Sequence, residues 1–168
     1  MEITKRELYD FKDRVFPKKI CFNPIGIIHT EFETLRGIPI QFSMSDTKGV
    51  IEIFPQYQDG LNHLEGFSHI YCIYFFDLVK LPVPLKSKPF LFDKNVGVFS
   101  MRTPFRPNPI GISVFEILEI KQNTIKVNNV DILDQTPILD IKPYISEFDC
   151  RKSFKHGWIE NKIRKMTS

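Results

Sequence analysis

The sequence has few cysteines and lacks the short motifs that identify many common classes of protein. It has three cysteines in 168 residues, Cys21, Cys72 and Cys150, and no two of them form a CxxC pair. An odd number of widely separated cysteines argues against a disulfide framework or a zinc knuckle. We therefore expect reduced, buried thiols in a cytoplasmic protein. The sequence also has no GxGxxG, no P-loop and no HExxH, which argues against a dinucleotide cradle, a nucleotide-phosphate loop and a zincin site.

Long apolar runs are absent as well. No stretch approaches the roughly 18 consecutive apolar residues that indicate a membrane-spanning helix. The first 20 residues carry charges throughout and lack the apolar core of a secretory signal. Leu8, Phe11 and Val15 recur there at helical spacing, which predicts a short amphipathic helix over residues 1–20.

The residues that are abundant favour β-structure. The chain is 42% hydrophobic and contains 16 phenylalanines but one tryptophan, a composition that suits strands and a single domain over residues 1–168. Short apolar segments separated by Gly and Pro predict strands at residues 22–32, 50–57, 67–76, 96–101, 112–120 and 124–133. The uninterrupted hydrophobicity of residues 67–76 further predicts burial on both faces. The pattern is that of a mainly β chain with a few short helices, an antiparallel barrel or a sandwich.

A stiff cationic segment, "MRTPFRPNPIG", occupies residues 101–111. Each of its three prolines fixes its own φ and pushes the preceding residue toward extended geometry, so the segment loses little entropy on ordering. Such a loop can hold Arg102, Arg106 and Asn108 in fixed directions, and an arginine fork suits a carboxylate or a phosphate. The alternative is a proline-stiffened connection with two exposed arginines.

A second proline-stiffened segment, residues 131–144, combines Asp131 and Asp140 with Lys142 and Tyr144. Aspartates in such a setting most often cap turns, and they can instead bind a hydroxyl or an amine. The four histidines lack metal-ligand spacing, so no metal site is expected. Residues 151–168 carry six Lys and Arg against one Glu, a basic tail that is either a solvated face or a site of attraction for a polyanion.

Several of these stretches together resemble one known family. The matching stretches are "IGIIHTEF", "GIPIQ", "GLNHLEGFSHIYCIYFF", "VGVFSMRTPFRPNPIGISVFEI" and "VDILDQTPILDIKPY", which cover about residues 23–149. They are similar to the TsaA/TrmO-like proteins, which are S-adenosylmethionine-dependent tRNA methyltransferases. The "RTPFRPNPIG" element is the most specific of these motifs.

The resemblance implies a compact antiparallel β-barrel, a non-Rossmann methyltransferase fold. It further implies a homodimer with S-adenosyl-L-methionine bound near the subunit interface, and methylation of N6 of threonylcarbamoyladenosine next to the anticodon of tRNA. Two alternatives stay open: a non-catalytic barrel that binds RNA or the cofactor, and a methyltransferase of the same fold that acts on a small molecule.

The resemblance also assigns residues. The implied cofactor contacts are Phe42, Ser43, Met44, Asp77, Leu78, Arg102, Ile112, Asn128, Asn129, Val130 and Asp131. Asp131 or Asp140 is the candidate acceptor for the N6 proton. The candidate RNA contacts are Arg106, Asn108, Lys142 and Tyr144, with the cations meeting phosphates and the tyrosine stacking.

The chain departs from the common family pattern at three places. Ser100–Met101 replaces the usual Ala-Thr, Gln135 replaces a glycine, and Asp77 replaces a histidine. We also expect no counterpart of the extra C-terminal domain that longer bacterial members carry.

Overall fold

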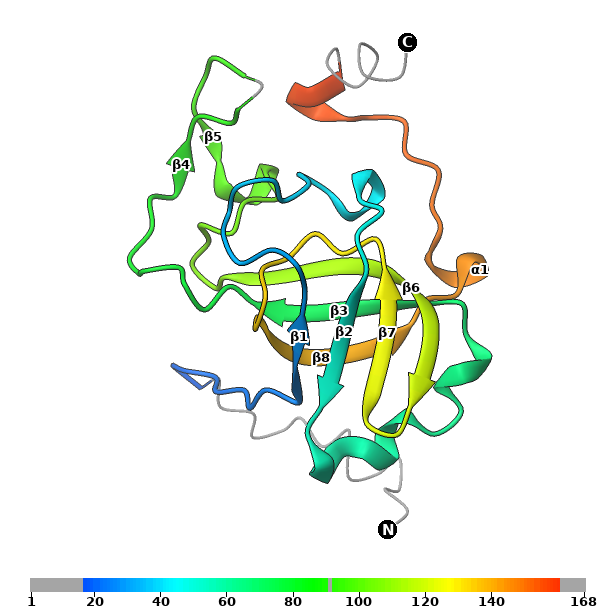
Figure 1. Ribbon diagram of the computed structural model, residues 1–168. Coiled ribbons are helices and arrows are strands. Elements are labelled where there is room, and N and C mark those ends of the chain that lie inside the picture. Colours follow the sequence, from blue (N-terminus) through cyan, green and yellow to red (C-terminus); the bar gives the residue numbers. More distant parts are fainter. Residues whose placement is uncertain (1–16, 91, 161–168) are drawn as a thin grey trace, which may run out of the picture.

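A closed β-barrel forms the body of the molecule (Figure 1). The computed structural model describes residues 17–90 and 92–160, so most of the helix predicted over residues 1–20 lies outside the described part. The barrel strands, all antiparallel to their neighbours, follow the order β1-β2-β7-β6-β3-β8. They are β1 (Gly26–His29), β2 (Gly49–Ile53), β3 (His69–Phe75), β6 (Ile110–Lys121), β7 (Thr124–Asn128) and β8 (Pro137–Pro143). The expected mainly β antiparallel barrel is confirmed.

Alternation along β3 shows how the strands build the core. Ile70, Cys72 and Tyr74 point into the barrel and are buried, whereas the residues between them are half-buried. Burial on both faces was therefore wrong for this strand, because its outer face is only partly covered. Successive side chains of a strand point to opposite faces, so one barrel interior takes every second residue.

The predicted hairpin near residue 122 is present. Lys121 pairs with Thr124 at its end, and Gln122 adopts a left-handed φ of 52° in the turn. β6 continues for 12 residues and also pairs with β3 over its first half, so it forms one long wall of the barrel.

The proline-rich segment around residue 140 required a correction. No strand was predicted there, but the segment forms strand β8, which pairs with both β1 and β3 and so closes the barrel. Pro137 and Pro143 are the first and last residues of this strand. Proline lacks an N–H and is tolerated at strand ends, where a ladder bond is not needed.

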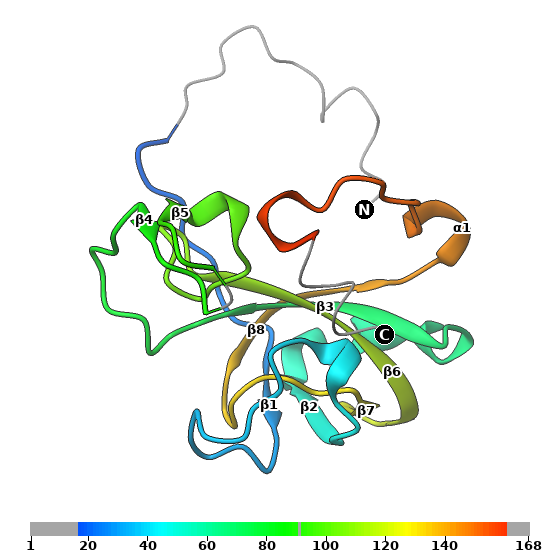
Figure 2. The same cartoon turned by 90° about the horizontal axis from the view of Figure 1, so that it is seen from above.

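Short elements decorate the barrel (Figures 1 and 2). A two-stranded sheet of β4 and β5 projects from it, and the strand expected at residues 96–101 is limited to β5, after which the chain turns into a 3₁₀ helix. The remaining elements are β4 (Lys86–Ser87), β5 (Val96–Gly97), α1 (Ser146–Asp149) and the 3₁₀ helices η1 (Phe42–Met44), η2 (Pro55–Leu61), η3 (Leu64–Gly66), η4 (Val98–Ser100) and η5 (Gly157–Ile159).

The cysteines differ from expectation in one respect. Cys72 is buried in the barrel, but Cys21 and Cys150 are exposed, since they lie in irregular segments before β1 and after α1. Among the helices in the described part of the chain, none has the length and apolarity needed to cross a membrane.

Candidate functional site

The loop around η1 lies at the upper end of the barrel in Figure 1 and is where several predicted site residues meet. Phe42 packs against the hydrophobic core and anchors the loop. The preceding residue, Gln41, accepts a hydrogen bond of 2.8 Å at its Oε1 from Nη1 of Arg102. The Arg102 side chain is otherwise exposed, so the rest of its guanidinium faces solvent beside η1.

Asp131 is the carboxylate of this cluster. The hydroxyl of Ser113 donates to its Oδ1 at 2.8 Å, and the backbone of Phe42 also hydrogen-bonds this carboxylate. Tyr74 lies on the other side of Ser113, with 3.1 Å between the two hydroxyl oxygens. Because Ser113 has one proton and gives it to Asp131, the tyrosine hydroxyl is the donor of that second bond. Burial raises the pKa of Asp131, and the hydrogen bonds oppose part of that effect.

The glycine that ends the "RPNPIG" motif makes room for this chain of hydrogen bonds. Gly111 pairs with Tyr74 across β6 and β3. A Cβ at Gly111 would lie 2.2 Å from Cε2 of the tyrosine ring, closer than any real contact. The absence of a side chain therefore lets the Tyr74 ring cross toward Ser113.

The segment after β7 is tied to the same loop. Asn129 adopts a left-handed φ of 66°, and its Nδ2 donates to the backbone oxygen of Ser45 at 2.7 Å. The Ser45 hydroxyl donates to the carbonyl of Val130, whose own N–H donates to Thr47 at 3.0 Å. These bonds bring Asn129, Val130 and Asp131 against the loop that carries Phe42 and Gln41.

Asn128 lies one residue earlier, near the outer face of the barrel. Its Nδ2 donates to Oε2 of Glu116 at 3.2 Å. Its Oδ1 is buried and has no hydrogen-bond partner among the described residues. An unpartnered buried acceptor is costly in a folded chain, and a ligand amine or hydroxyl would satisfy it.

The other predicted cofactor residues are not joined to this cluster by any hydrogen bond of their side chains in the described residues. Leu78 and Ile112 are exposed by 72% and 60%, and Met44 by 57%. Ser43 and Asp77 are exposed too. The structure thus gathers Phe42, Arg102, Asn129, Val130 and Asp131, and it leaves Ser43, Met44, Asp77, Leu78 and Ile112 facing solvent.

The predicted RNA contacts have different surroundings. The guanidinium of Arg106 folds back on its own segment, where Nη1 donates to the carbonyls of Met101 at 2.7 Å and Val98 at 3.4 Å. It also lies 5.9 Å from the centre of the Phe99 ring. Arg106 therefore does not point outward as a free cation, whereas Asn108 is exposed.

Lys142 and Tyr144 belong to β8 and the residue just after it. Nζ of Lys142 forms an ion pair of 2.7 Å with Asp140. The half-buried ring of Tyr144 makes edge contacts with Tyr71 and His69, with centroids 5.4 and 6.2 Å apart. His69 is half-buried and hydrogen-bonds Ser68, so it is not a core residue.

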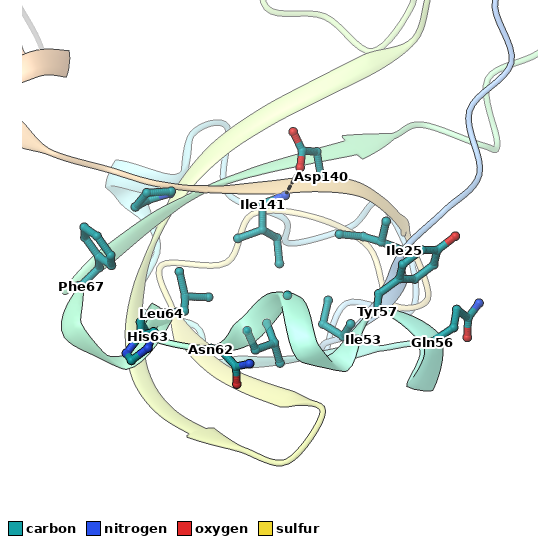
Figure 3. Close-up of a pocket in the computed structure, with 13 residues that line it drawn as sticks. Ile25, Ile53, Gln56, Tyr57, Asn62, His63, Leu64, Phe67, Asp140 and Ile141 are labelled. Atoms are coloured by element: carbon teal, nitrogen blue, oxygen red, sulfur yellow. Dashed lines mark hydrogen bonds between the residues drawn. The ribbon is translucent and has the colours of Figure 1, made fainter. Parts of the chain in front are cut away.

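Asp140 lies in a different neighbourhood from Asp131. It borders a cavity of about 560 Å³ between β8, η2 and η3, at the end of the barrel opposite η1 (Figures 1 and 3). Its carboxylate points away from that cavity in Figure 3 and accepts the backbone N–H of Ile141 at 2.9 Å. With Lys142 on its other oxygen, Asp140 is a structural carboxylate in this structure.

Sequence reasoning missed three residues of the cluster: Gln41, Tyr74 and Ser113. Ser113 carried a usable signal, because alternation along β6 directs it into the core with Phe115. A polar residue at an inward position needs a partner, and here the partner is Asp131. Among the described residues, no group of three His, Cys, Asp or Glu side chains is arranged to hold a metal ion.

Comparison with known proteins adds the family to this geometry. Residues 27–150 match the model of the tRNA-methyltransferase O N-terminal domain. The chain belongs to this family. It resembles a crystal structure of TrmO from Pseudomonas aeruginosa with a TM-score of 0.70 and 31% identity, covering 83% of this chain and 62% of that one. The family resemblance drawn from the motifs is thereby confirmed.

Relatives within the family carry two kinds of name. A probable S-adenosyl-L-methionine-binding protein of Pyrococcus abyssi is 46% identical over 90% of this chain and 83% of its own length. An S-adenosyl-L-methionine-binding protein of Archaeoglobus fulgidus is 42% identical over 78% and 94%. A mouse tRNA (adenine(37)-N6)-methyltransferase is 34% identical over 84% of this chain and 34% of its own length.

Proposed function

We propose that this chain transfers a methyl group from S-adenosyl-L-methionine to N6 of threonylcarbamoyladenosine next to the anticodon of a tRNA, in the cytoplasm. Its membership in the tRNA-methyltransferase O family makes it an S-adenosyl-L-methionine-dependent methyltransferase. The nucleobase and the tRNA are the proposed part, supported by the mouse relative named for adenine 37. The observation that carries the proposal is the cluster in which the η1 loop joins Arg102 to Asp131.

The residues present fit the cofactor. Arg102, held on one side by Gln41, can meet the methionine carboxylate with its remaining donors. The Asp131 carboxylate accepts from hydroxyl or amine groups, and the unpartnered Oδ1 of Asn128 is a second acceptor for an amine. Together these groups match a ligand with one carboxylate, ribose hydroxyls and an adenine amine.

The bound cofactor supplies an electrophilic methyl group. The chain must hold the acceptor nitrogen in line with that methyl, and such positioning contributes much of the rate in group transfer. The N6 nitrogen loses its proton as the new bond forms. Asp131 is the acceptor we propose for it, because its raised pKa makes it a better base than an ordinary aspartate, whereas Asp140 is already paired with Lys142.

We further propose that a homodimer completes the site. Large exposed apolar side chains follow one another from the end of β3 into the first residues of β6. They are Leu78, Leu81, Leu85, Phe90, Phe99, Phe105, Ile110 and Ile112, exposed by 38% to 93%. Exposed apolar residues at this density mark an interaction surface. Leu78 and Ile112, two of the predicted cofactor residues that have no hydrogen bond to the η1 cluster, are among these side chains.

The decisive experiment is methyl transfer from labelled S-adenosyl-L-methionine to tRNA that lacks only this methyl. Transfer to N6 of the threonylcarbamoyl nucleoside, and none to a tRNA already methylated there, is the expected result. A folded dimer that binds the cofactor but transfers nothing would contradict the proposal.

A second experiment tests the site itself. Arg102→Ala should weaken cofactor binding in calorimetry by about tenfold or more, since it removes a charge-assisted contact worth about 1.5–3 kcal/mol. Arg36→Ala, another exposed arginine, is the matched control and should bind normally. Unchanged affinity of the Arg102 variant would refute the carboxylate assignment.

The alternative that the names of the archaeal relatives favour is a barrel that binds the cofactor without methylating tRNA. Tight tRNA binding without turnover would support a non-catalytic RNA-binding role. Turnover on a small nucleoside alone would support a small-molecule methyltransferase.

A further inference from the structure

The chain does not stop at the barrel after β8 but crosses the molecule. Residues 150–156, here called the strap, run from α1 to η5, which lies against the projecting β4–β5 sheet (Figures 1 and 2). The strap has no helix or strand of its own, and all of its residues are exposed. Its course is therefore determined by what holds its two ends.

Trp158 holds the far end. Its indole N–H donates to the carbonyl of Ser100 at 2.8 Å, and its ring lies 5.7 Å from that of Phe92 at an interplanar angle of 31°. Trp158 is half-buried in this contact. A lone tryptophan that buries part of its ring and uses its only donor on a specific carbonyl is an anchor for the segment that carries it.

The anchor is on the same turn that supports the candidate site. Carbonyls of η4 and the next residue accept from two separate side chains: Val98 and Met101 from Arg106, and Ser100 from Trp158. Arg102 follows this turn directly. The strap is thus fixed next to the segment that presents Arg102.

The strap and its docking segment share one sign of charge. The strap carries Arg151, Lys152 and Lys155 and no acidic residue. Residues 80–106, here called the arm, carry six Lys and Arg and one acidic residue, Asp93. Within the described residues the only ion pair on either segment joins Lys88 to Asp93 at 3.2 Å. Because the whole chain has a net charge of only +3, the remainder is acidic overall.

We propose that the strap and the lysines of the arm, joined by Trp158, form one cationic surface that binds the phosphate backbone of RNA, beside the apolar side chains of the arm that we assign to the dimer. This rests on the proposed function, because the surface borders the site to which we assign tRNA. Exposed lysines along the two segments, together with Arg151, suit a polyanion with repeated phosphates. Such contacts position the nucleic acid without reading its sequence. The prediction is a salt-dependent contribution to tRNA affinity that does not involve the cofactor.

The main test removes two charges from the strap. Lys152→Ala/Lys155→Ala should weaken binding of a tRNA transcript by roughly three- to tenfold at moderate salt and lower the slope of log K against log salt by about 1–2. Binding of S-adenosyl-L-methionine in calorimetry should stay unchanged. The matched control is Lys121→Ala/Lys126→Ala on the β6–β7 hairpin, which also removes two positive charges and should leave tRNA affinity near that of the wild type.

Trp158→Ala tests the position of the strap separately from its charge, because the variant keeps every lysine and arginine. It should weaken tRNA binding about as much as the double lysine variant and increase hydrogen exchange of residues 98–101. Trp158→Phe, which keeps a ring beside Phe92 but loses the bond to Ser100, should fall between Trp158→Ala and the wild type.

The outcomes distinguish this inference from the proposed function. Equal loss of tRNA affinity in the strap and hairpin variants, or no loss in either, would overturn the strap surface whatever the methylation result. Strap-dependent tRNA binding without methyl transfer would keep the surface and refute the proposed reaction. Loss of binding to phosphatidylserine vesicles with intact tRNA binding would overturn the RNA assignment in favour of a lipid surface.

Discussion

The Ser113 hydroxyl donates a hydrogen bond of 2.8 Å to the carboxylate of Asp131. The two residues come from different parts of the fold: Ser113 from the inner face of β6, and Asp131 from the segment after β7. Tyr74 from β3 completes the chain of hydrogen bonds at 3.1 Å. A carboxylate that we propose to contact the cofactor is therefore held from inside the barrel. Four predictions test this arrangement and its surroundings.

Ser113→Ala should destabilise the fold and loosen Asp131. The change leaves the buried Tyr74 hydroxyl without its acceptor and removes a donor from a charged group, at a cost of about 1–3 kcal/mol. Urea denaturation measures this loss. Ser153→Ala, an exposed serine in the strap, is the control and should change stability by about 0.5 kcal/mol or less. Equal effects of the two variants would show that the buried bond contributes nothing.

Gly111→Ala should destabilise by about 1–3 kcal/mol or more, because the new Cβ overlaps the Tyr74 ring at 2.2 Å. Gly60→Ala is the comparison, since a Cβ there meets nothing within 4 Å. Combining Gly111→Ala with Tyr74→Leu should recover part of the loss, as expected for residues in direct contact. Additive losses in the double variant, seen by thermal unfolding, would contradict the steric explanation.

The pH dependence of stability should differ in sign for two aspartates. Burial raises the pKa of Asp131 in the folded chain, so the unfolded chain releases this proton at lower pH. The folded state thus loses stability as pH rises from the ordinary aspartate value of about 3.9 through the raised pKa. Asp131→Asn lacks this loss, and its stability relative to the wild type should increase across that interval.

Asp134 should show the opposite pH dependence of stability to Asp131. The backbone N–H of Thr30 donates to its carboxylate at 3.0 Å and is the first cause of a lowered pKa. Its stabilising contribution is complete above the ordinary pKa and is lost as pH falls through the lowered one. Asp134→Asn should therefore be less stable than the wild type at neutral pH and approach it in acid. Denaturation midpoints from pH 3 to 7, roughly the range over which aspartates titrate, would show opposite trends for the two variants, and parallel trends would refute the assignment.

Arg106→Ala should open the turn at residues 98–101, because two carbonyls there lose their donor. Hydrogen exchange of that turn should accelerate by about tenfold or more, as expected from the loss of a charge-assisted bond worth about 1.5–3 kcal/mol. Arg102→Ala, four residues earlier, should leave the turn protected, since Arg102 bonds to Gln41 instead. Faster exchange in both variants would mean that the two arginines do not have separate roles.

The strand pattern shows how far local sequence could determine the fold. The hairpin turn at Gln122 is a local property and was predicted. The alternation along Ile70, Cys72 and Tyr74 was not, because the continuous hydrophobicity of residues 67–76 favoured burial on both faces. Strand β8 was not predicted either, because the prolines at its two ends look like loop residues until pairing shows which N–H groups the ladder needs.

By itself, the sequence determined the antiparallel β-class, the family motifs and the residue types available for the cofactor. Only the tertiary structure decided which of these residues act together. Arg102 and Arg106 share one proline-stiffened motif. Gln41 holds Arg102 at the η1 cluster, whereas Arg106 donates to the carbonyls of Val98 and Met101. Asp131 and Asp140 share another motif, yet one meets Ser113 inside the barrel and the other pairs with Lys142. The partners of Arg102 and Asp131 lie on other strands or loops, and closing the barrel brings those groups within hydrogen-bond distance. Arg106 and Asp140 instead find their partners on their own segments.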